Sequence, residues 1–173
     1  LTRNKTFIAD ADHQYAYSFD EQGDTMWVGS TGSISYAYND TMHIVAKWPD
    51  GLSLGPPYCM ITAPDNKLWY CNGYGAYQLD KKTYKVDTLP ELKNQNVRTL
   101  TLHNNFIFIG TYGNGYYLYK DGKVASMPMD KNNFLSQVHS FVFDKNGYVW
   151  MTTNKGLFKT KEAALENHFN DSA

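Results

Sequence analysis

The stretch of sequence that decides the fold is Asp144-Lys145-Asn146-Gly147-Tyr148-Val149-Trp150-Met151-Thr152-Thr153-Asn154-Lys155-Gly156-Leu157-Phe158. Its Asn-Gly pair is a turn signal, because these residues accept the positive φ that tight hairpin turns need. An aromatic and apolar strand follows the turn, and a second glycine leads into another apolar strand. An extended run from Val138 to Phe143 precedes it. The stretch therefore predicts consecutive antiparallel strands joined by short turns.

The same pattern occurs four times along the chain of 173 residues. Each copy has a large aromatic residue followed by an apolar, a small and a polar residue, and the aromatic residues are Trp27, Trp69, Phe108 and Trp150. The spacings between them are 42, 39 and 42 residues. In three copies a fourth short strand can be drawn. Four short strands with a period of about 40 residues are typical of a β-propeller blade.

The middle strands carry unbroken apolar runs, such as the one from Phe106 to Ile109. Such runs indicate that both faces of each sheet are covered, as they are between stacked blades. We therefore predict an all-β fold: a β-propeller of about four blades, each of four antiparallel strands, and part of a larger propeller, for example a seven-bladed one. A self-contained four-bladed ring is an alternative. A β-sandwich is another, but it does not explain the period.

The predicted blades cover residues 13–52, 53–92, 93–134 and 135–173, and residues 1–12 are the remnant of a preceding blade. The last blade departs from the others at its end. Thr160 can cap a helix, and the Ala, Glu and Leu residues after it favour one. A short helix near 161–168 is therefore expected in place of a fourth strand.

Charge argues against a nucleic-acid-binding protein, and hydropathy argues against a membrane-spanning helix in this chain. The chain has 16 basic and 17 acidic residues and a formal net charge of −1, whereas a nucleic-acid-binding protein carries a basic surplus or stripe. No nucleic-acid partner is predicted. No apolar stretch approaches the length of about 20 residues that spans a bilayer.

The two cysteines, Cys59 and Cys71, are predicted to be buried thiols. If Asp65-Asn66 forms a two-residue turn, Cys71 lies opposite Met60 and Cys59 lies opposite Asn72. The thiols then point to opposite faces of the sheet and cannot form a disulfide. A register change of one residue would reverse this conclusion.

The fifteen-residue stretch resembles the pattern Asp-x-x-Gly-x-Leu-Trp-Ile-Gly-Thr-x-x-Gly-Leu-Tyr of the two-component regulator propeller repeats. These repeats build the periplasmic sensor regions of hybrid two-component histidine kinases from Bacteroidetes. The resemblance covers nearly the whole chain, although Cys71 replaces a glycine of the pattern and Phe108 replaces a tryptophan. It implies a ligand-sensing ectodomain fragment on the periplasmic or extracellular side of a bacterial inner membrane. It also implies ligands such as oligosaccharides, and a kinase that lies outside this segment.

The loops between second and third strands are the predicted binding site, because in a propeller they converge near the axis on one face. Tyrosine rings there can stack on a sugar and amide groups can bond its hydroxyls, although Asn and Gly also serve turns by themselves. The candidate ligand-binding residues are Thr31, Asn72, Tyr74, Tyr112, Asn114, Asn154 and Lys155. The repeated tryptophans are expected in the core, where they pack between strands.

No catalytic residue, metal site or cofactor is predicted. The recurring aspartates stand at the turns between first and second strands, away from the candidate loops, and no pair of acids suited to hydrolysis can be placed. The expected ligand is a glycan or another small molecule. The exposed blade faces are expected to be covered by the remaining propeller blades or by a second copy of the chain, which would make a homodimer. A protein-interaction scaffold and a glycosidase or lyase fragment are the alternative functions.

Overall fold

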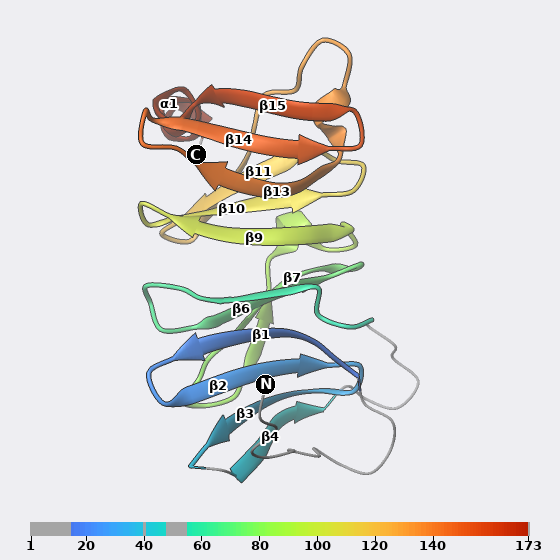
Figure 1. Cartoon of the computed structure of the whole chain (residues 1–173), viewed down its shortest axis with the longest axis vertical. Coiled ribbons are helices and arrows are strands. Elements are labelled where there is room, and N and C mark those ends of the chain that lie inside the picture. The colour runs from blue at the N-terminus through green and yellow to red at the C-terminus, as the bar shows by residue number, and fades with distance from the viewer. Residues whose placement is uncertain (1–14, 40, 48–54, 173) are drawn as a thin grey trace, which may run out of the picture.

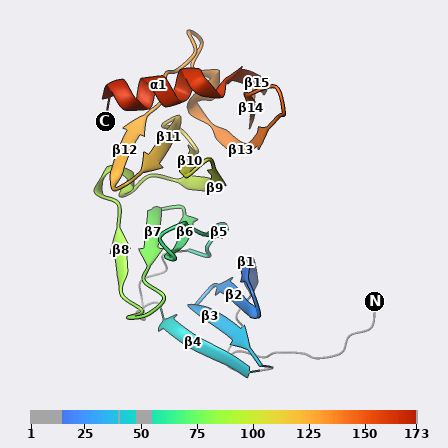
Figure 2. The same cartoon turned by 90° about the vertical axis from the view of Figure 1, so that its left-hand side faces the viewer.

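The computed structural model describes residues 15–39, 41–47 and 55–172, so the predicted remnant at 1–12 lies outside the described residues. The protein is all-β except for a single described α-helix and two short 3₁₀ turns, and its strands form four antiparallel sheets stacked one on another (Figures 1 and 2). Three sheets have four strands and the last has three. Strand order follows chain order in every sheet, as in the blades of a β-propeller.

The strands of the first two blades are β1 (Ala16–Gln22), β2 (Thr25–Ser30), β3 (Ser33–Tyr38), β4 (Thr41–Lys47), β5 (Cys59–Thr62), β6 (Leu68–Asn72), β7 (Gly75–Leu79) and β8 (Val86–Thr88). The remaining elements are β9 (Val97–His103), β10 (Phe106–Thr111), β11 (Tyr116–Lys120), β12 (Lys123–Ser126), β13 (Val138–Phe143), β14 (Tyr148–Thr153), β15 (Gly156–Lys161) and α1 (Glu162–Ser172). The first strands β1, β5, β9 and β13 contact one another from blade to blade. Figure 2 shows them along one side of the stack and β8 and β12 on the other. The first strands therefore form the inner edge of the fan of blades.

In the first three blades, the aromatic residue of the repeat packs against the following blade. Trp27 lies in a buried cluster with Met60 and Tyr70 of the second blade, and Phe108 contacts Phe141 of the fourth blade with ring centroids 5.6 Å apart. Trp69 is 0% exposed and belongs to the cluster between the second and third blades. Apolar faces on both sides of the inner blades explain why their strands read as unbroken apolar runs.

The prediction of a core tryptophan is wrong for Trp150. It faces away from the third blade, and it is only half-buried. Together with Val142 and Leu157 it lines a hollow on the outward face of the last blade. The reason is positional: the repeat turns this residue toward the next blade, and none of the described residues forms one there.

A small residue follows the repeated aromatic residue by two positions, because neighbouring blades approach each other closely there. A Cβ atom on Gly110 would lie 2.4 Å from the carbonyl oxygen of Val138 in the next blade. Real Cβ atoms do not come this close to a backbone oxygen. The second blade has Cys71 at the equivalent position, where its side chain is fully buried between the second and third blades.

The helix α1 occupies the place of a fourth strand in the last blade, beginning at Glu162 and ending later than the predicted 161–168. The expected cap at Thr160 is wrong, because this residue belongs to β15 and pairs with Val149. The helix buries Leu165 and Phe169, and the ring of Phe169 meets Phe106 of the third blade edge-on at 5.3 Å between centroids. Burial of these apolar side chains, which local propensity does not report, extends the helix.

The predicted register of the two cysteines is also wrong. The turn between β5 and β6 has three residues, because the amide of Ala63 donates to the carbonyl of Lys67 at 3.0 Å and Asn66 takes a left-handed φ of 64°. This extra residue shifts the pairing by one position and sets Cys59 opposite Cys71. Both are free thiols on the same face of the sheet, in the cluster between the second and third blades.

Candidate functional site

A β-bulge lies near the start of the first strand in three blades. The pairing of β1, β9 and β13 with the following strand skips one residue, and the skipped residues are Tyr17, Arg98 and His139. Tyr58 is equivalent in the second blade, since it directly precedes the paired residue Cys59. A bulge turns a side chain out of the regular alternation of a strand and is common beside binding sites. Each blade therefore presents one selected side chain at the inner edge.

Four side chains at this edge form a continuous row. The guanidinium carbon of Arg98 lies 4.7 Å from the ring centroid of Tyr58 and 5.4 Å from that of Tyr112. The ring of Tyr112 lies 6.0 Å from that of His139. We call Tyr58, Arg98, Tyr112 and His139 the axial row. It joins three blades.

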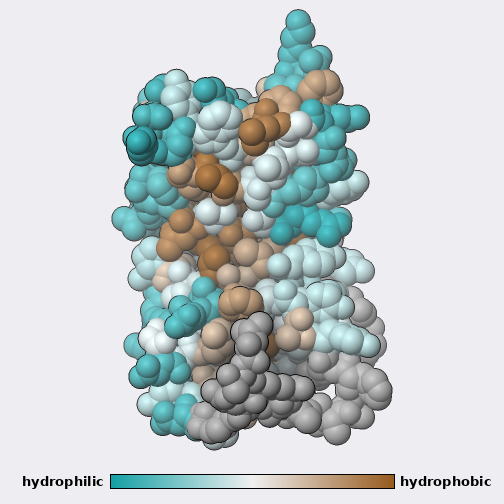
Figure 3. Space-filling model, in the orientation of Figure 1, coloured by the Kyte–Doolittle hydropathy of each residue, from teal (hydrophilic) through white to brown (hydrophobic). Residues whose placement is uncertain are grey.

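The inner strands face the viewer in Figure 1, with β9 and β13 in front of their blades. In the same orientation, Figure 3 shows an apolar band along the middle of this face, with hydrophilic residues on both sides of it. The inner edge is thus a mixed surface on which aromatic rings and isolated polar groups stand together. Such a mixture is typical of small-molecule sites.

Arg98 is the unpaired charge of the axial row. Its Nε atom is buried without a hydrogen-bond partner, and so is the Oδ1 atom of Asn96. None of the ion pairs among the described residues includes Arg98. Guanidinium groups remain charged at every accessible pH and offer five donors, so this one retains unused bonding capacity.

The predicted asparagines hold their loops in place. The side-chain amide of Asn114 donates to Gln95, and that of Asn154 donates to Gln137 at 2.5 Å. The Oδ1 atom of Asn154 also lies 2.8 Å from Nε2 of His139. Each of these asparagines ties the loop between second and third strands to the segment that enters the first strand of the same blade.

Asn72 is fully buried, and its Oδ1 accepts the backbone amide of Tyr74 at 2.8 Å. The Thr31 hydroxyl accepts the amide of Tyr15 at 3.3 Å, and the Lys155 amide donates to the Thr153 hydroxyl. The contacts of Asn72 and Lys155 stay within their own turns, and that of Thr31 ties its loop to the start of the first strand.

The structure brings only some of the predicted site residues together. Tyr112 and Asn154 meet at His139, and Tyr112 stacks with Arg98. Tyr74 is 51% exposed on its own loop, and no described interaction joins Thr31 or Lys155 to the axial row. Sequence reasoning missed Arg98, Tyr58 and His139. Their spacings of 40 and 41 residues were the available signal.

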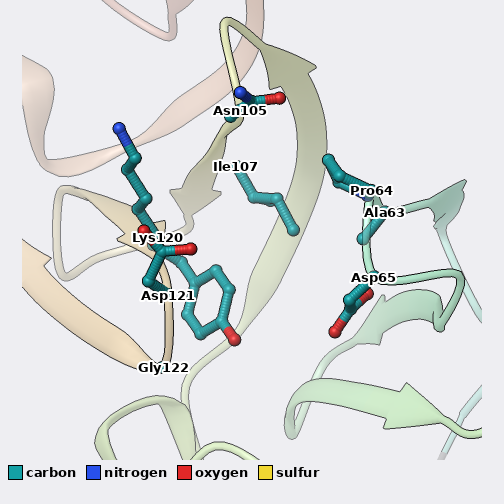
Figure 4. A pocket seen from close by; sticks show the side chains of 9 residues that line it. Ala63, Pro64, Asp65, Asn105, Ile107, Lys120, Asp121 and Gly122 are labelled. Carbon is teal, nitrogen blue, oxygen red and sulfur yellow. The ribbon is translucent and has the colours of Figure 1, made fainter.

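A second hollow lies at the opposite end of the blades. It has a volume of about 440 Å³ and lies between the turns of the second and third blades, where Figure 4 shows Asp65 and Asp121 on opposite sides. The Asp65 carboxylate accepts the backbone amide of Lys67 at 3.1 Å and pairs with its ammonium group at 3.7 Å. This carboxylate is thus engaged in its own turn.

The part of the chain that the structure describes contains no group of three or more His, Cys, Asp or Glu side chains arranged to hold a metal ion. No helix within it is long and apolar enough to cross a membrane.

Comparison with solved structures shows the fold. The extracellular domain of the putative hybrid two-component system BT3049 from B. thetaiotaomicron matches with a TM-score of 0.67 at 20% identity, over 88% of this chain and 22% of that one. "YCF48 bound to D1 peptide" matches with a TM-score of 0.65 at 16% identity, over 92% of this chain and 54% of that one. The computationally designed Ika4 protein matches with a TM-score of 0.65 at 12% identity, over 89% of this chain and 95% of that one.

At these identities the matches define a structural class and no more. The chain is a run of β-propeller blades, and it spans about a fifth of the BT3049 extracellular domain and about half of the YCF48 chain. No family model and no curated protein matches the sequence.

Proposed function

We propose that this chain is part of the ligand-sensing ectodomain of a bacterial two-component sensor, on the periplasmic or extracellular side of the inner membrane, and that it binds oligosaccharides. The observation that carries the proposal is the axial row, which places Tyr58 and Tyr112 around a cation at the inner edge of the blades. Tyrosine offers a flat apolar ring and a hydroxyl on one side chain. Sugars need both, because they present apolar ring faces and hydroxyl groups.

Two further findings support the sensor role. The repeat resembles the two-component regulator propeller pattern, and the fold matches the extracellular domain of the putative hybrid two-component system BT3049 from B. thetaiotaomicron and that of BT4673, which is described both as a putative hybrid two-component and as a putative one-component system. Both are similarities of pattern and fold, so the ligand must be argued from the site itself. We propose that the segment binds without turnover, since the imidazole of the axial row, His139, bonds the side chain of Asn154 and no carboxylate stands in the row to orient it as an acid or base.

Calorimetry against a panel of oligosaccharides tests the proposal. We expect heat of binding from at least one oligosaccharide and its loss in Tyr112→Ala. The matched control is Tyr38→Ala, since Tyr38 is similarly exposed but stands at the other end of its blade. No heat with any member of the panel, or equal loss in both variants, would contradict it. Assays for new reducing ends on the same panel test the absence of turnover.

A second proposal concerns the two outward blade faces, which we expect to be covered by further propeller blades or by a second copy of this chain. Val142 and Leu157 are each 61% exposed beside Trp150 on the last blade, and Phe19 is 72% exposed on the first. Exposed apolar patches of this kind mark interaction surfaces. By the repeat, Trp150 stands where Trp27 and Trp69 pack on a following blade.

Sedimentation equilibrium separates these occupants. Concentration-dependent dimerisation that Trp150→Glu abolishes indicates a second copy. Tyr84→Glu is the control, because Tyr84 is an exposed aromatic residue in the turn between β7 and β8. If this chain is monomeric and longer versions of the protein are more stable than it is, further blades cover the face. Unchanged self-association in Trp150→Glu would show that this face is not the interface.

A further inference from the structure

Arg98 is fixed in orientation without being neutralised. Its planar guanidinium lies over the rings of Tyr58 and Tyr112, with its central carbon 4.7 and 5.4 Å from their centroids. Arginine stacks on aromatic faces in this way and keeps the edge of its plane for hydrogen bonds. The stacking lowers the conformational entropy that a ligand would otherwise have to remove.

The guanidinium has no acidic partner among the described residues. None of their ion pairs includes it, none of the described side chains accepts a hydrogen bond from it, and its Nε is buried and unpaired. A partly buried charge with unsatisfied donors costs free energy in the absence of a partner. A ligand that supplies an anion recovers this cost, whereas a neutral ligand recovers only part of it.

Groups suited to hydroxyls stand next to the cation. A Cβ atom placed on Gly73 would lie 3.5 Å from the Tyr58 hydroxyl and 3.9 Å from Oδ1 of Asn96, so both groups lie beside the backbone of Gly73. The Asn96 oxygen is buried without a partner. One charged donor, one phenol hydroxyl and one amide acceptor therefore gather where the second and third blades meet.

We infer that Arg98 receives the carboxylate of a uronic-acid residue, so that the ligand of this segment is an acidic glycan. Arginine binds carboxylates through paired, charge-assisted hydrogen bonds, which are stronger than those to neutral hydroxyls. Although Arg98 lies over both rings, Tyr58 is 37% and Tyr112 43% exposed, so each keeps apolar surface for a pyranose, which a bare anion would not use. This inference rests on the proposed sugar-binding function and names the chemistry of the same site.

The test is an NMR titration of the whole chain, labelled with ¹⁵N, against glucuronate and glucose. We expect glucuronate to shift the Nε–H signal of Arg98 and to bind at least tenfold more tightly than glucose. Arg98→Gln should remove this preference, and Arg98→Lys should restore only part of it, because ammonium lacks the planar fork. Lys123→Gln, which removes one exposed charge on the outer strand β12, should leave the preference unchanged.

Each other outcome has a distinct meaning. Equal binding of glucose and glucuronate, or an undiminished preference in Arg98→Gln, overturns the inference and leaves sugar binding intact. Equal binding of glucuronate and N-acetylglycine overturns the assignment to a glycan and points to a peptide carboxylate. If no sugar in this titration or in the oligosaccharide panel binds, the proposed function fails together with the inference. Circular dichroism of the Arg98 variants checks that the blades remain folded.

Discussion

Cys59 and Cys71 lie directly opposite each other on the neighbouring strands β5 and β6. Opposed residues in an antiparallel pair have Cα atoms about 4.5–5.5 Å apart, which is within the range of disulfides. Burial raises the pKa of the Cys71 thiol well above its usual value, and it raises the pKa of the Cys59 thiol as well. Since the thiolate is the nucleophile, the folded protein should exchange disulfides slowly.

We therefore expect a disulfide between Cys59 and Cys71 when the unfolded chain refolds with glutathione disulfide. The protein thiols lose two hydrogen atoms and one glutathione disulfide becomes two glutathione thiols. The closed loop is short, and the chain-entropy model gives a stabilisation of about 3 kcal/mol. Mass spectrometry of the linked peptides and urea unfolding with and without reductant measure both effects. Cys59→Ser is the control, and two alkylatable thiols after oxidative refolding would disprove the prediction.

Gly110→Ala should destabilise the protein by about 1–3 kcal/mol, as overpacked cores do. The added methyl group would meet the Val138 carbonyl oxygen at 2.4 Å, so the third and fourth blades must separate. The control is Gly73→Ala, because the nearest atom to its Cβ is at 3.5 Å. Urea unfolding of the two variants gives the comparison. Equal midpoints would show that the blades adjust without cost.

Trp69→Ala should cost about 3–5 kcal/mol of unfolding free energy, because Trp69 is 0% exposed and a buried cavity would remain. Trp150→Ala should cost clearly less in the isolated chain, because its indole lies on an open face and leaves no buried cavity, so the loss is mainly that of the hydrogen bond from its N–H to Asp144 at 2.8 Å. Denaturant unfolding of both variants measures the difference. Similar losses would mean that the outward face is covered in solution.

Alkaline pH should destabilise the fold through Tyr116. Burial raises the pKa of this phenol to about 12, whereas the unfolded chain ionises near 10. The group therefore binds its proton more tightly when folded, and its contribution is complete below about pH 10 and is lost as the pH rises toward 12. The loss is about 2–3 kcal/mol from this residue. Tyr116→Phe should make the pH dependence of unfolding less steep between about pH 10 and 12 without abolishing it, because burial also raises the pKa of Tyr70, and parallel curves for the two proteins would contradict the assignment.

The sequence by itself determined the blades, because hydrophobic periodicity and turn residues are local signals that recur about every 40 residues. The aromatic at the centre of each repeat, the turn before it and the glycine after it could all be read without coordinates. The sequence also indicated where the strand pattern stops, since the residues after Thr160 favour a helix. The length of the helix could not be predicted, because its last turns are stabilised by the packing of Phe169 on Phe106 of another blade.

Only the tertiary structure decided which side chains meet. The places of Arg98 and His139 in the axial row depend on bulges that slip the pairing of β9 and β13 by one residue, and the pairing of Cys59 with Cys71 depends on a three-residue turn. A slip of one residue moves a side chain to the other face of a sheet. Hydrophobic pattern alone does not report such a slip. The loop asparagines could be predicted from the sequence, but the position of Arg98 over Tyr58 and Tyr112 is decided by the packing of neighbouring blades.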